Sequence, residues 1–126
     1  MKRWKINLII SCFYSSTLIG CIDDKCELKL TDYFDESSWK QDSLASLGYR
    51  NQQYKLLLAN ESSLLVKNKE CIINKLGKPN DEVSYQNGDK AIFYIVYPGK
   101  HVEAIEHIVF TLDKNQKVKS VRHVLP

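Results

Sequence analysis

The second half of the chain alternates apolar and polar residues with a period of two, and this pattern limits the possible folds more than any other feature. Two such stretches, DEVSYQ and KAIFYIVY, stand on either side of Asn87-Gly88, a dipeptide that favours the type I′ turn of a β-hairpin. A second pair, HVEAIEHIVFTL and KVKSVRHVL, flanks residues 113–116. We therefore expect four antiparallel strands joined by short turns.

The first half of the mature chain has the longer period of helices. Apolar residues in 46–59 recur at helical spacing, and Gly48 is expected to weaken the first turn of this helix. A second, shorter helix is predicted to begin after Asn68 as N-cap and to end at Gly77, two residues before a proline. The stripe of the first helix comprises Leu47, Tyr54, Leu57 and Leu58, and that of the second Ile72, Ile73 and Leu76.

Together these patterns predict an α+β domain in which two short helices precede a four-stranded antiparallel β-meander and pack on one face of its sheet. A chain of 126 residues with 44% hydrophobic content is long enough for one small core and too short for two. We expect three regions: a leader in residues 1–20, an acidic tether in 21–43 and a single domain in 44–126.

The first twenty residues have the features of an export signal. Lys2, Arg3 and Lys5 precede a largely apolar run in residues 6–19 that is diluted by five polar side chains. A helix needs about 20 mostly apolar residues to cross the hydrocarbon of a bilayer, so a permanent transmembrane segment is the weaker alternative.

The end of this leader, Leu18-Ile19-Gly20-Cys21, resembles the box at which bacterial lipoproteins are processed. The resemblance implies that the Cys21 thiol receives a diacylglyceryl group, that the chain is cut before Cys21, and that the new amino terminus is acylated, often with palmitate. More than one acyl chain is what stable membrane anchoring requires. Ile22 stands where an aspartate would resemble an inner-membrane retention signal, so the resemblance favours the outer membrane, with the domain facing the periplasm.

The segment behind the lipidation box differs from the rest of the chain. Residues 22–43 carry seven acidic and three basic side chains, which is typical of a solvated tether. Tyr33, Phe34 and Trp39 are costly to leave in water, so we expect them to dock on the domain. Beyond Gly20 the chain has 15 basic and 15 acidic residues, and this balance argues against a nucleic-acid partner.

The stretch NKECIINKLGKPNDE, the strand GDKAIFYIVYP and the final IEHIVFTLDKNQKVKSVRHV resemble the SmpA/OmlA (BamE-like) family of small lipoprotein domains. The shared pattern is a short helix ending in Leu-Gly-x-Pro, a strand with an aromatic pair, and a last hairpin to which Phe110, Asp113 and Val118 correspond. The likeness covers about residues 66–124, and the preceding segment is similar to related uncharacterised lipoproteins. It implies an α+β fold and a role in an outer-membrane assembly.

Residues suited to chemistry are few. Once Cys12 is removed with the leader and Cys21 is lipidated, Cys26 and Cys71 remain, and they either form one disulfide or stay as two thiols. The three histidines, His101, His107 and His123, match no metal-ligand spacing, so no metal and no other cofactor is expected. No nucleophile motif or phosphate-binding loop is present either, so we predict no enzyme and no small-molecule substrate.

The function that we expect is that of a lipid-anchored, non-enzymatic envelope protein that binds another envelope protein as an assembly or accessory module. The candidate binding residues are the aromatics of the second strand, Phe93, Tyr94 and Tyr97. Since both parities of this strand are apolar, either one side packs on the helices while the other binds a partner, or both sides are covered within the fold. The alternative function is a lipoprotein inhibitor or immunity protein directed against a secreted toxin or hydrolase.

Overall fold

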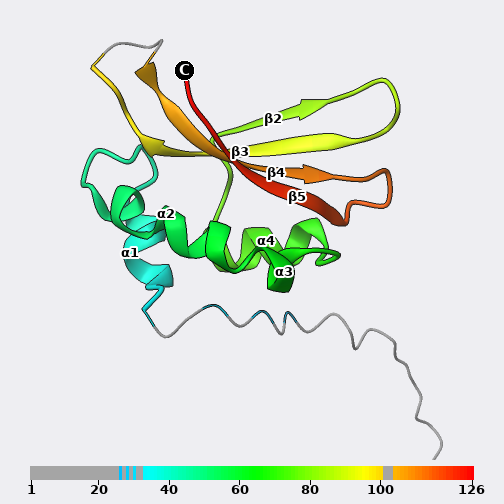
Figure 1. Ribbon diagram of the computed structural model, residues 1–126, viewed down its shortest axis with the longest axis horizontal. Coiled ribbons are helices and arrows are strands. Elements are labelled where there is room, and N and C mark those ends of the chain that lie inside the picture. Colours follow the sequence, from blue (N-terminus) through cyan, green and yellow to red (C-terminus); the bar gives the residue numbers. More distant parts are fainter. Residues whose placement is uncertain (1–25, 27, 29, 31–32, 101–103) are drawn as a thin grey trace, which may run out of the picture.

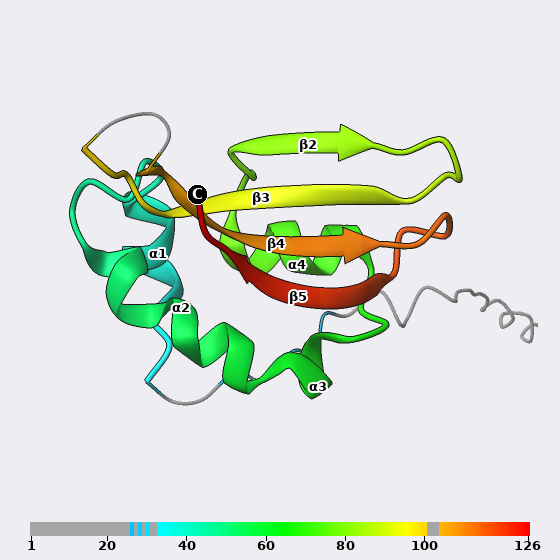
Figure 2. The same cartoon turned by 45° about the horizontal axis from the view of Figure 1, so that its top comes forward.

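The computed structural model describes residues 26, 28, 30, 33–100 and 104–126. In this part of the chain, helices cover one face of a four-stranded antiparallel sheet, and the other face has no helix over it (Figures 1 and 2). The predicted α+β class and the meander are confirmed.

The sheet is built from sequence neighbours only. Its strands are β2 (Asp81–Ser84), β3 (Lys90–Tyr97), β4 (Glu106–Leu112) and β5 (Val118–Val124), in the spatial order β2-β3-β4-β5. All three pairings are antiparallel. The central strands β3 and β4 are therefore paired on both sides, and β2 and β5 form the edges.

The turn between β2 and β3 differs from the type I′ turn that Asn87-Gly88 predicted. The Gly88 N–H donates to the Tyr85 carbonyl at 3.1 Å, and the Tyr85 N–H donates to the Asp89 carbonyl at 2.9 Å. A type I′ turn needs positive φ at both central residues, but here Gly88 has a φ of 94° and Asn87 is not in that region. The connection is a type I turn over Gln86 and Asn87 with Gly88 as the bulge residue.

Four helices stand where two were predicted. They are α1 (Glu36–Gln41), α2 (Tyr49–Ala59), α3 (Glu61–Leu64) and α4 (Lys69–Leu76). Helices α2 and α4 correspond to the two predicted helices, whereas α1 lies within the segment expected to be a tether and α3 within a polar break. The two additional helices are short, of six and four residues.

Local sequence explains where the two longer helices begin. The side chain of Asn68 accepts from the Cys71 N–H at 2.8 Å, as a capping residue of α4 should. Helix α2 starts later than predicted, because Gly48 is its N-cap with a left-handed φ of 85°. Leu47 consequently lies outside the helix and is 58% exposed, so its predicted place in the buried stripe is wrong.

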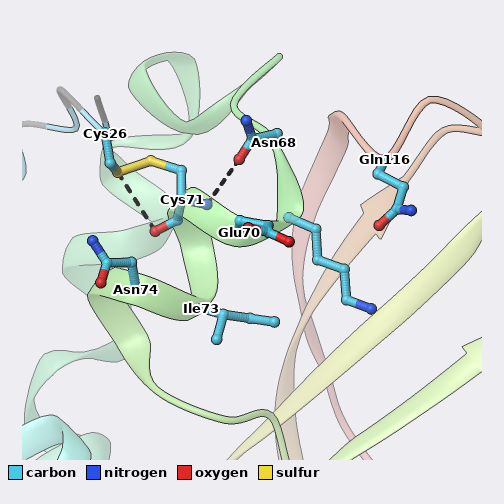
Figure 3. A pocket seen from close by; sticks show the side chains of 8 residues that line it. Cys26, Asn68, Glu70, Cys71, Ile73, Asn74 and Gln116 are labelled. Carbon is cyan, nitrogen blue, oxygen red and sulfur yellow. Dashed lines mark hydrogen bonds between the residues drawn. A yellow bond between two sulfur atoms is a disulfide. The ribbon is translucent and has the colours of Figure 1, made fainter. Parts of the chain in front are cut away.

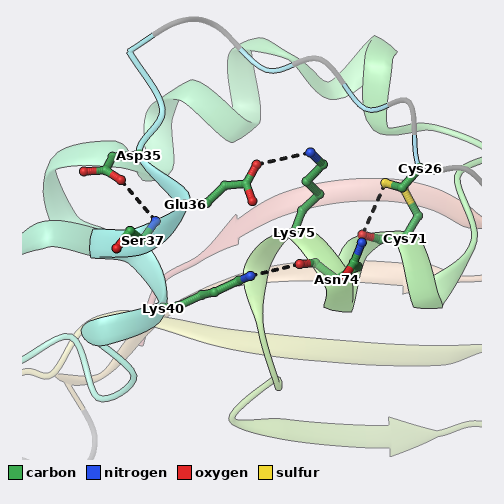
Figure 4. Close-up of polar contacts among 8 residues, drawn as sticks. All are labelled: Cys26, Asp35, Glu36, Ser37, Lys40, Cys71, Asn74 and Lys75. Atoms are coloured by element: carbon green, nitrogen blue, oxygen red, sulfur yellow. Dashed lines mark hydrogen bonds and ion pairs between the residues drawn. A yellow bond between two sulfur atoms is a disulfide. The ribbon is translucent and has the colours of Figure 1, made fainter.

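Helix α1 is held against α4 by polar contacts and by one large side chain. Asp35 caps its first turn, and Glu36 forms an ion pair with Lys75 of α4 at 3.2 Å (Figure 4). Lys40 donates to the carbonyl of Asn74 at 3.0 Å. Trp39 is fully buried in the core. Of the three aromatics expected to dock, Trp39 is therefore in the core, Phe34 packs against its edge, and Tyr33 is 86% exposed.

The core lies between the helices and the sheet face that they cover. One side of each central strand supplies it, and these side chains are Ile92, Tyr94 and Val96 from β3 and Ile108, Phe110 and Leu112 from β4. Tyr94 stacks edge-on against Phe110, and its hydroxyl donates to the carbonyl of Gly77 at 2.7 Å. Because that carbonyl lies at the end of α4, the hydrogen bond ties the helix terminus to the middle of the sheet.

A buried arginine joins the helices to the end of β3 near Ile95. Arg50 of α2 is 1% exposed, and its guanidinium lies 4.9 Å from the centroid of the Trp39 ring. It donates to the carbonyls of Trp39 at 3.0 Å and Ile95 at 3.3 Å, and to the side-chain oxygen of Asn80 at 3.0 Å. Burial lowers the pKa of Arg50, and the nearby Asp42 carboxylate opposes this effect.

The backbone that Arg50 contacts is irregular. The register of β3 against β4 shifts between Ile95 and Tyr97, so Val96 has no partner in β4. The Asn51 side chain donates to the Val96 carbonyl at 3.3 Å, next to the Ile95 carbonyl that Arg50 binds. Two successive side chains of α2 thus satisfy backbone oxygens at a β-bulge, where regular pairing is interrupted.

We expect Arg50→Met to lower the free energy of unfolding by about 3 kcal/mol, because it leaves several buried carbonyl and amide oxygens without a donor. The matched control is Lys55→Met, which places the same side chain at an exposed position of the same helix and should change stability by less than about 0.5 kcal/mol. Urea unfolding followed by circular dichroism measures both. Equal stabilities of the two variants would contradict a structural role for Arg50.

Candidate functional site

The three aromatics predicted as binding residues lie in different environments. Tyr94 is fully buried and faces the helices, so its predicted role in binding is wrong. Phe93 points to the opposite side of the sheet and is partly buried, and Tyr97 follows the β-bulge and is 38% exposed. Helices α2 and α4 cover only one side of β3, and Tyr94 lies on that side.

The sheet face without helices is the candidate site, and we call it the open face. The strand registers place on it the residues opposite in parity to the core: Asp81, Val83, Ala91, Phe93, Ile95, His107, Val109, Thr111, Ser120, Arg122 and Val124. Its centre, on β3 and β4, is mainly apolar but includes His107 and Thr111, and the edge strands add the polar Asp81, Ser120 and Arg122 beside Val83 and Val124. This is the arrangement expected of a protein-binding surface with a hydrophobic centre and a polar rim.

The centre of the open face is tightly packed within the sheet itself. Ala91 is 1% exposed and Val109 is 2% exposed, although no helix covers them. Phe93 lies above this layer, with its ring centroid 5.5 Å from that of His107 in an edge-to-face arrangement. The accessible apolar surface is therefore offered by the larger side chains, Phe93 and Ile95, together with Val83, which is 37% exposed.

Backbone groups at the β5 edge of the sheet are engaged by other parts of the chain, and one N–H of β2 is engaged by its own strand. Along β5, the Val66 N–H donates to the Val118 carbonyl and the Val118 N–H to the Lys67 carbonyl, both at 2.9 Å. A carboxylate oxygen of Glu61 accepts from the Val121 N–H at 3.1 Å. On the four-residue strand β2, Asp81 accepts from the N–H of Glu82 at 2.8 Å. Since the β5 edge is occupied and β2 is only four residues long, the open face rather than an edge is the better docking surface.

His107 is the titratable group at the centre of the open face. Burial lowers its pKa below the usual 6.5, and the carboxylate of Asp81 acts in the opposite direction. A lowered pKa keeps the imidazole neutral at pH 7, so His107 adds no charge to the apolar centre. The role of His107 in this surface was not predicted, because it depends on the register of β4 rather than on a motif.

The two histidines that the structure describes, His107 and His123, do not converge. His107 is on the open face, whereas His123 of β5 faces the helices, stacks on Tyr54 with centroids 4.6 Å apart, and lies 2.9 Å from a Glu106 oxygen through Nε2. His101 lies outside the described residues. In the part of the chain that the structure describes, no group of three histidine, cysteine or acidic residues is placed to hold a metal ion.

Cys26 and Cys71 form a disulfide, which decides between the two alternatives left open by the sequence. Their Cα atoms are 5.1 Å apart and 45 residues apart in sequence, and Cys71 lies in the first turn of α4. A covalent loop of this length stabilises a fold by about 3–4 kcal/mol through the entropy of the unfolded chain. The next side chains along the N-terminal segment, Leu28 and Leu30, pack against the core.

A groove open to solvent lies beside the disulfide (Figure 3). It is lined by Cys26, Asn68, Lys69, Glu70, Cys71, Ile73, Asn74 and Gln116. The ammonium of Lys69 is held by the carboxylate of Glu82 at 2.9 Å, so it is not poised as a base or nucleophile. Among the lining residues no nucleophile is hydrogen-bonded to a base, and the open face is the stronger candidate site.

The lipidation site Cys21 and the rest of the processing motif, Leu18, Ile19 and Gly20, lie outside the described residues. Within the described ranges, no helix has the length and apolar content needed to span a bilayer.

Comparison with models of protein families, with curated proteins and with solved structures gave no match. The resemblance to the SmpA/OmlA family therefore stays a prediction from the motifs in residues 66–124.

The two faces of β3 predict contrasting mutational effects. Tyr94→Ala should lower the free energy of unfolding by about 3–5 kcal/mol, because it leaves a cavity in the core and removes the hydrogen bond to Gly77. Phe93→Ala, at the neighbouring position on the open face, should cost only about 1 kcal/mol. Chemical denaturation of both variants measures the difference. Losses of equal size would show that the open face is packed like the core.

His107 also predicts a dependence of stability on pH. Because its folded-state pKa is lowered below 6.5, the unfolded chain binds this proton more readily, and stability is highest above pH 6.5 and falls as the pH is lowered through the folded-state pKa. Urea midpoints at pH 7.5 and 5.5 should therefore differ less in His107→Gln than in the unmodified protein. An unchanged difference would assign the pH dependence to other groups.

Proposed function

We propose that this protein is a lipid-anchored, non-enzymatic lipoprotein of the cell envelope that binds another envelope protein through the open face. The observation that carries the binding role is the position of Phe93 and Ile95, two large apolar side chains on a sheet face that no helix of the described chain covers. The leader and the box ending at Cys21 support the anchor. The outer membrane, facing the periplasm, is the proposed location.

The chemistry of the open face favours a protein over a small molecule as the ligand. It is a sheet surface whose smallest central residues, Ala91 and Val109, are already packed, so it offers a broad surface rather than a deep cavity. Small-molecule sites are usually concave and enclose most of their ligand. A partner with an apolar patch could bury Phe93 and Ile95, and the polar rim, which includes Asp81 and Arg122, could fix its orientation.

The structural roles of the buried ionisable groups in the described residues support a non-enzymatic role. Three ionisable side chains in the described residues are almost fully buried, and each makes structural hydrogen bonds. Arg50 and Tyr94 donate to backbone oxygens, and Asp42 accepts from the backbone N–H groups of Leu47 and Arg50. Desolvation raises the pKa of Tyr94 well above its usual value, so it stays protonated as a donor. Strongly perturbed groups mark catalytic sites only when they face a cleft, and Arg50 and Tyr94 face the core.

Crosslinking in intact cells tests the proposal. We expect the unmodified protein to form one or more specific crosslinked species and Phe93→Asp to reduce them by at least about ten-fold, because a charge is placed at the centre of the interface. The matched control is Leu44→Asp, which adds the same charge at a side chain that is 62% exposed in the loop before α2. This control should leave the crosslinks unchanged.

Two control measurements show whether a loss of crosslinking is due to the open face and whether the membrane anchor is at Cys21. Circular dichroism of purified Phe93→Asp must show the native fold, since unfolding would abolish crosslinks for another reason. Cys21→Ala should move the protein from the membrane fraction to the aqueous fraction. Equal crosslinking of Phe93→Asp and the unmodified protein would reject the open face as the binding surface, and membrane retention of Cys21→Ala would reject the anchor.

A further inference from the structure

The disulfide lies at one particular end of the domain. Asn68 and Lys69, just before Cys71, are joined to the β4–β5 turn, since the Lys69 N–H donates to the Gln116 carbonyl at 2.9 Å and Asn68 forms a bridge with Lys117. The β2–β3 turn lies beside it, because a Cβ at Gly88 would be 3.1 Å from that of Lys114. We call this the turn end: the start of α4, both hairpin turns and the disulfide (Figures 1 and 3).

The opposite end of the sheet carries the β-bulge, helix α1 and the C-terminus. Arg50 and Asn51 bind carbonyls at the bulge, and Val124 is paired with His107 near the start of β4. Strand β5 runs between the two ends over seven residues, which corresponds to about 23 Å. If one end of the domain faces a membrane, the other end is therefore farther from the membrane by about the length of β5.

A lipid anchor at Cys21 would hold the turn end, rather than the opposite end, close to the membrane. Only five peptide links separate Cys21 from Cys26, and a fully extended chain covers at most about 18 Å over that number of residues. Because Cys26 is bonded to Cys71 and their Cα atoms are 5.1 Å apart, a lipid on Cys21 keeps the start of α4 within about 23 Å of the bilayer surface. Without the disulfide, the N-terminal segment would be held by the packing of Leu28, Leu30 and Phe34 and by the Asp35 N–H, which donates to Gln53.

The charge of the turn end is compatible with a lipid surface. Lys67, Lys114 and Lys117 lie around it and form no ion pair within the described part of the chain. The acidic side chains at the same end include Glu70, Asp113 and Asp89, of which Asp89 is paired with Lys119. Cationic side chains are attracted to anionic headgroups over about one Debye length. The open face extends away from this end along the strands, so anchoring does not bury it.

We propose that the Cys26–Cys71 disulfide makes the turn end the membrane-facing surface of the domain and directs the bulge end, with the C-terminus, away from the lipid. This inference rests on the proposed lipid anchor at Cys21 and adds an orientation to it. If the segment before α1 were released, the attachment point would move to Asp35, at the opposite end of the domain, and the orientation would no longer be fixed.

Quenching by lipid headgroups tests this orientation in full-length protein that has been processed and lipidated in bacteria. A fluorescent amino acid is placed either at position 115, in the β4–β5 turn, or after Pro126, and the protein is reconstituted in vesicles with quencher-bearing headgroups. Since the two positions differ by about the length of β5, quenching at position 115 should exceed that at the C-terminus by at least about two-fold.

The decisive variant lengthens the tether and leaves the fold intact. Ten Gly and Ser residues inserted between Asp23 and Asp24 keep the disulfide but remove the limit on distance, so the ratio of quenching at the two positions should fall towards one. Cys26→Ser with Cys71→Ser should act in the same direction, as should reduction by a dithiol, which is itself oxidised to a disulfide as it supplies two electrons and two protons to the sulfurs.

The outcomes separate the two proposals. Protein that fails to sediment with the vesicles overturns the anchor, and the orientation with it. Anchored protein with equal quenching at both positions, or with a ratio that the insertion does not change, overturns the orientation and leaves the anchor standing. A two-fold ratio that is lost on insertion supports both.

Discussion

The fold depends on a buried cation, Arg50, whose guanidinium donates to backbone and amide oxygens and lies against aromatic rings, with the buried Asp42 carboxylate nearby. Its guanidinium donates to oxygens from the turn after α1, the loop after α4 and the bulged part of β3. Asn80 accepts from both Arg50 and the Ile95 N–H, so the loop after α4 is fixed by the same group. Five donors in one plane can satisfy several carbonyls at once, which explains why an arginine serves here better than a lysine.

This arrangement leaves the two faces of the sheet in different states. On the core side of β3 the helices pack against the sheet and α2 donates to the carbonyls at the bulge, whereas the other side has no helix of the described chain over it. The β5 edge is occupied by Glu61 and residues 66–67 and β2 is short, so in the described residues the open face is the broad surface of the sheet left for association. Natural sheets often restrict pairing at their edges in this way.

Much of the fold could be predicted from the sequence, because a two-residue period of apolar side chains identifies the strands. The bounds of β3 agree with the KAIFYIVY pattern, and α4 begins and ends at its predicted cap and stop. Helix α1 was not predicted because its acidic surroundings favoured a tether, although Asp35 before the helix and Trp39 within it were signals that could have revealed it. The buried state of Arg50 could not be predicted, because its neighbours in the first half of α2, residues 51–53, are polar and a charged side chain is usually exposed.

The site was less predictable for a physical reason. Alternation identifies two sides of β3, but both are apolar, and only the positions of α2 and α4 decide that Tyr94 enters the core and Phe93 does not. The disulfide poses the same problem, since a separation of 45 residues in sequence says nothing about a Cα distance of 5.1 Å. Properties that depend on how two elements meet require the three-dimensional structure.

The position of the disulfide in the chain also bears on the order in which the molecule assembles. All four strands follow Cys71, so the sheet lies wholly outside the covalent loop, and its three pairings join neighbours in sequence. The contacts that close the helical layer join residues 34 to 45 positions apart, as in Lys40 with Asn74 and Cys26 with Cys71. Contacts between distant residues carry a larger entropic cost of closure. The meander can therefore form before the helices pack on it. The disulfide between Cys26 and Cys71 then forms once α4 and the N-terminal segment lie side by side.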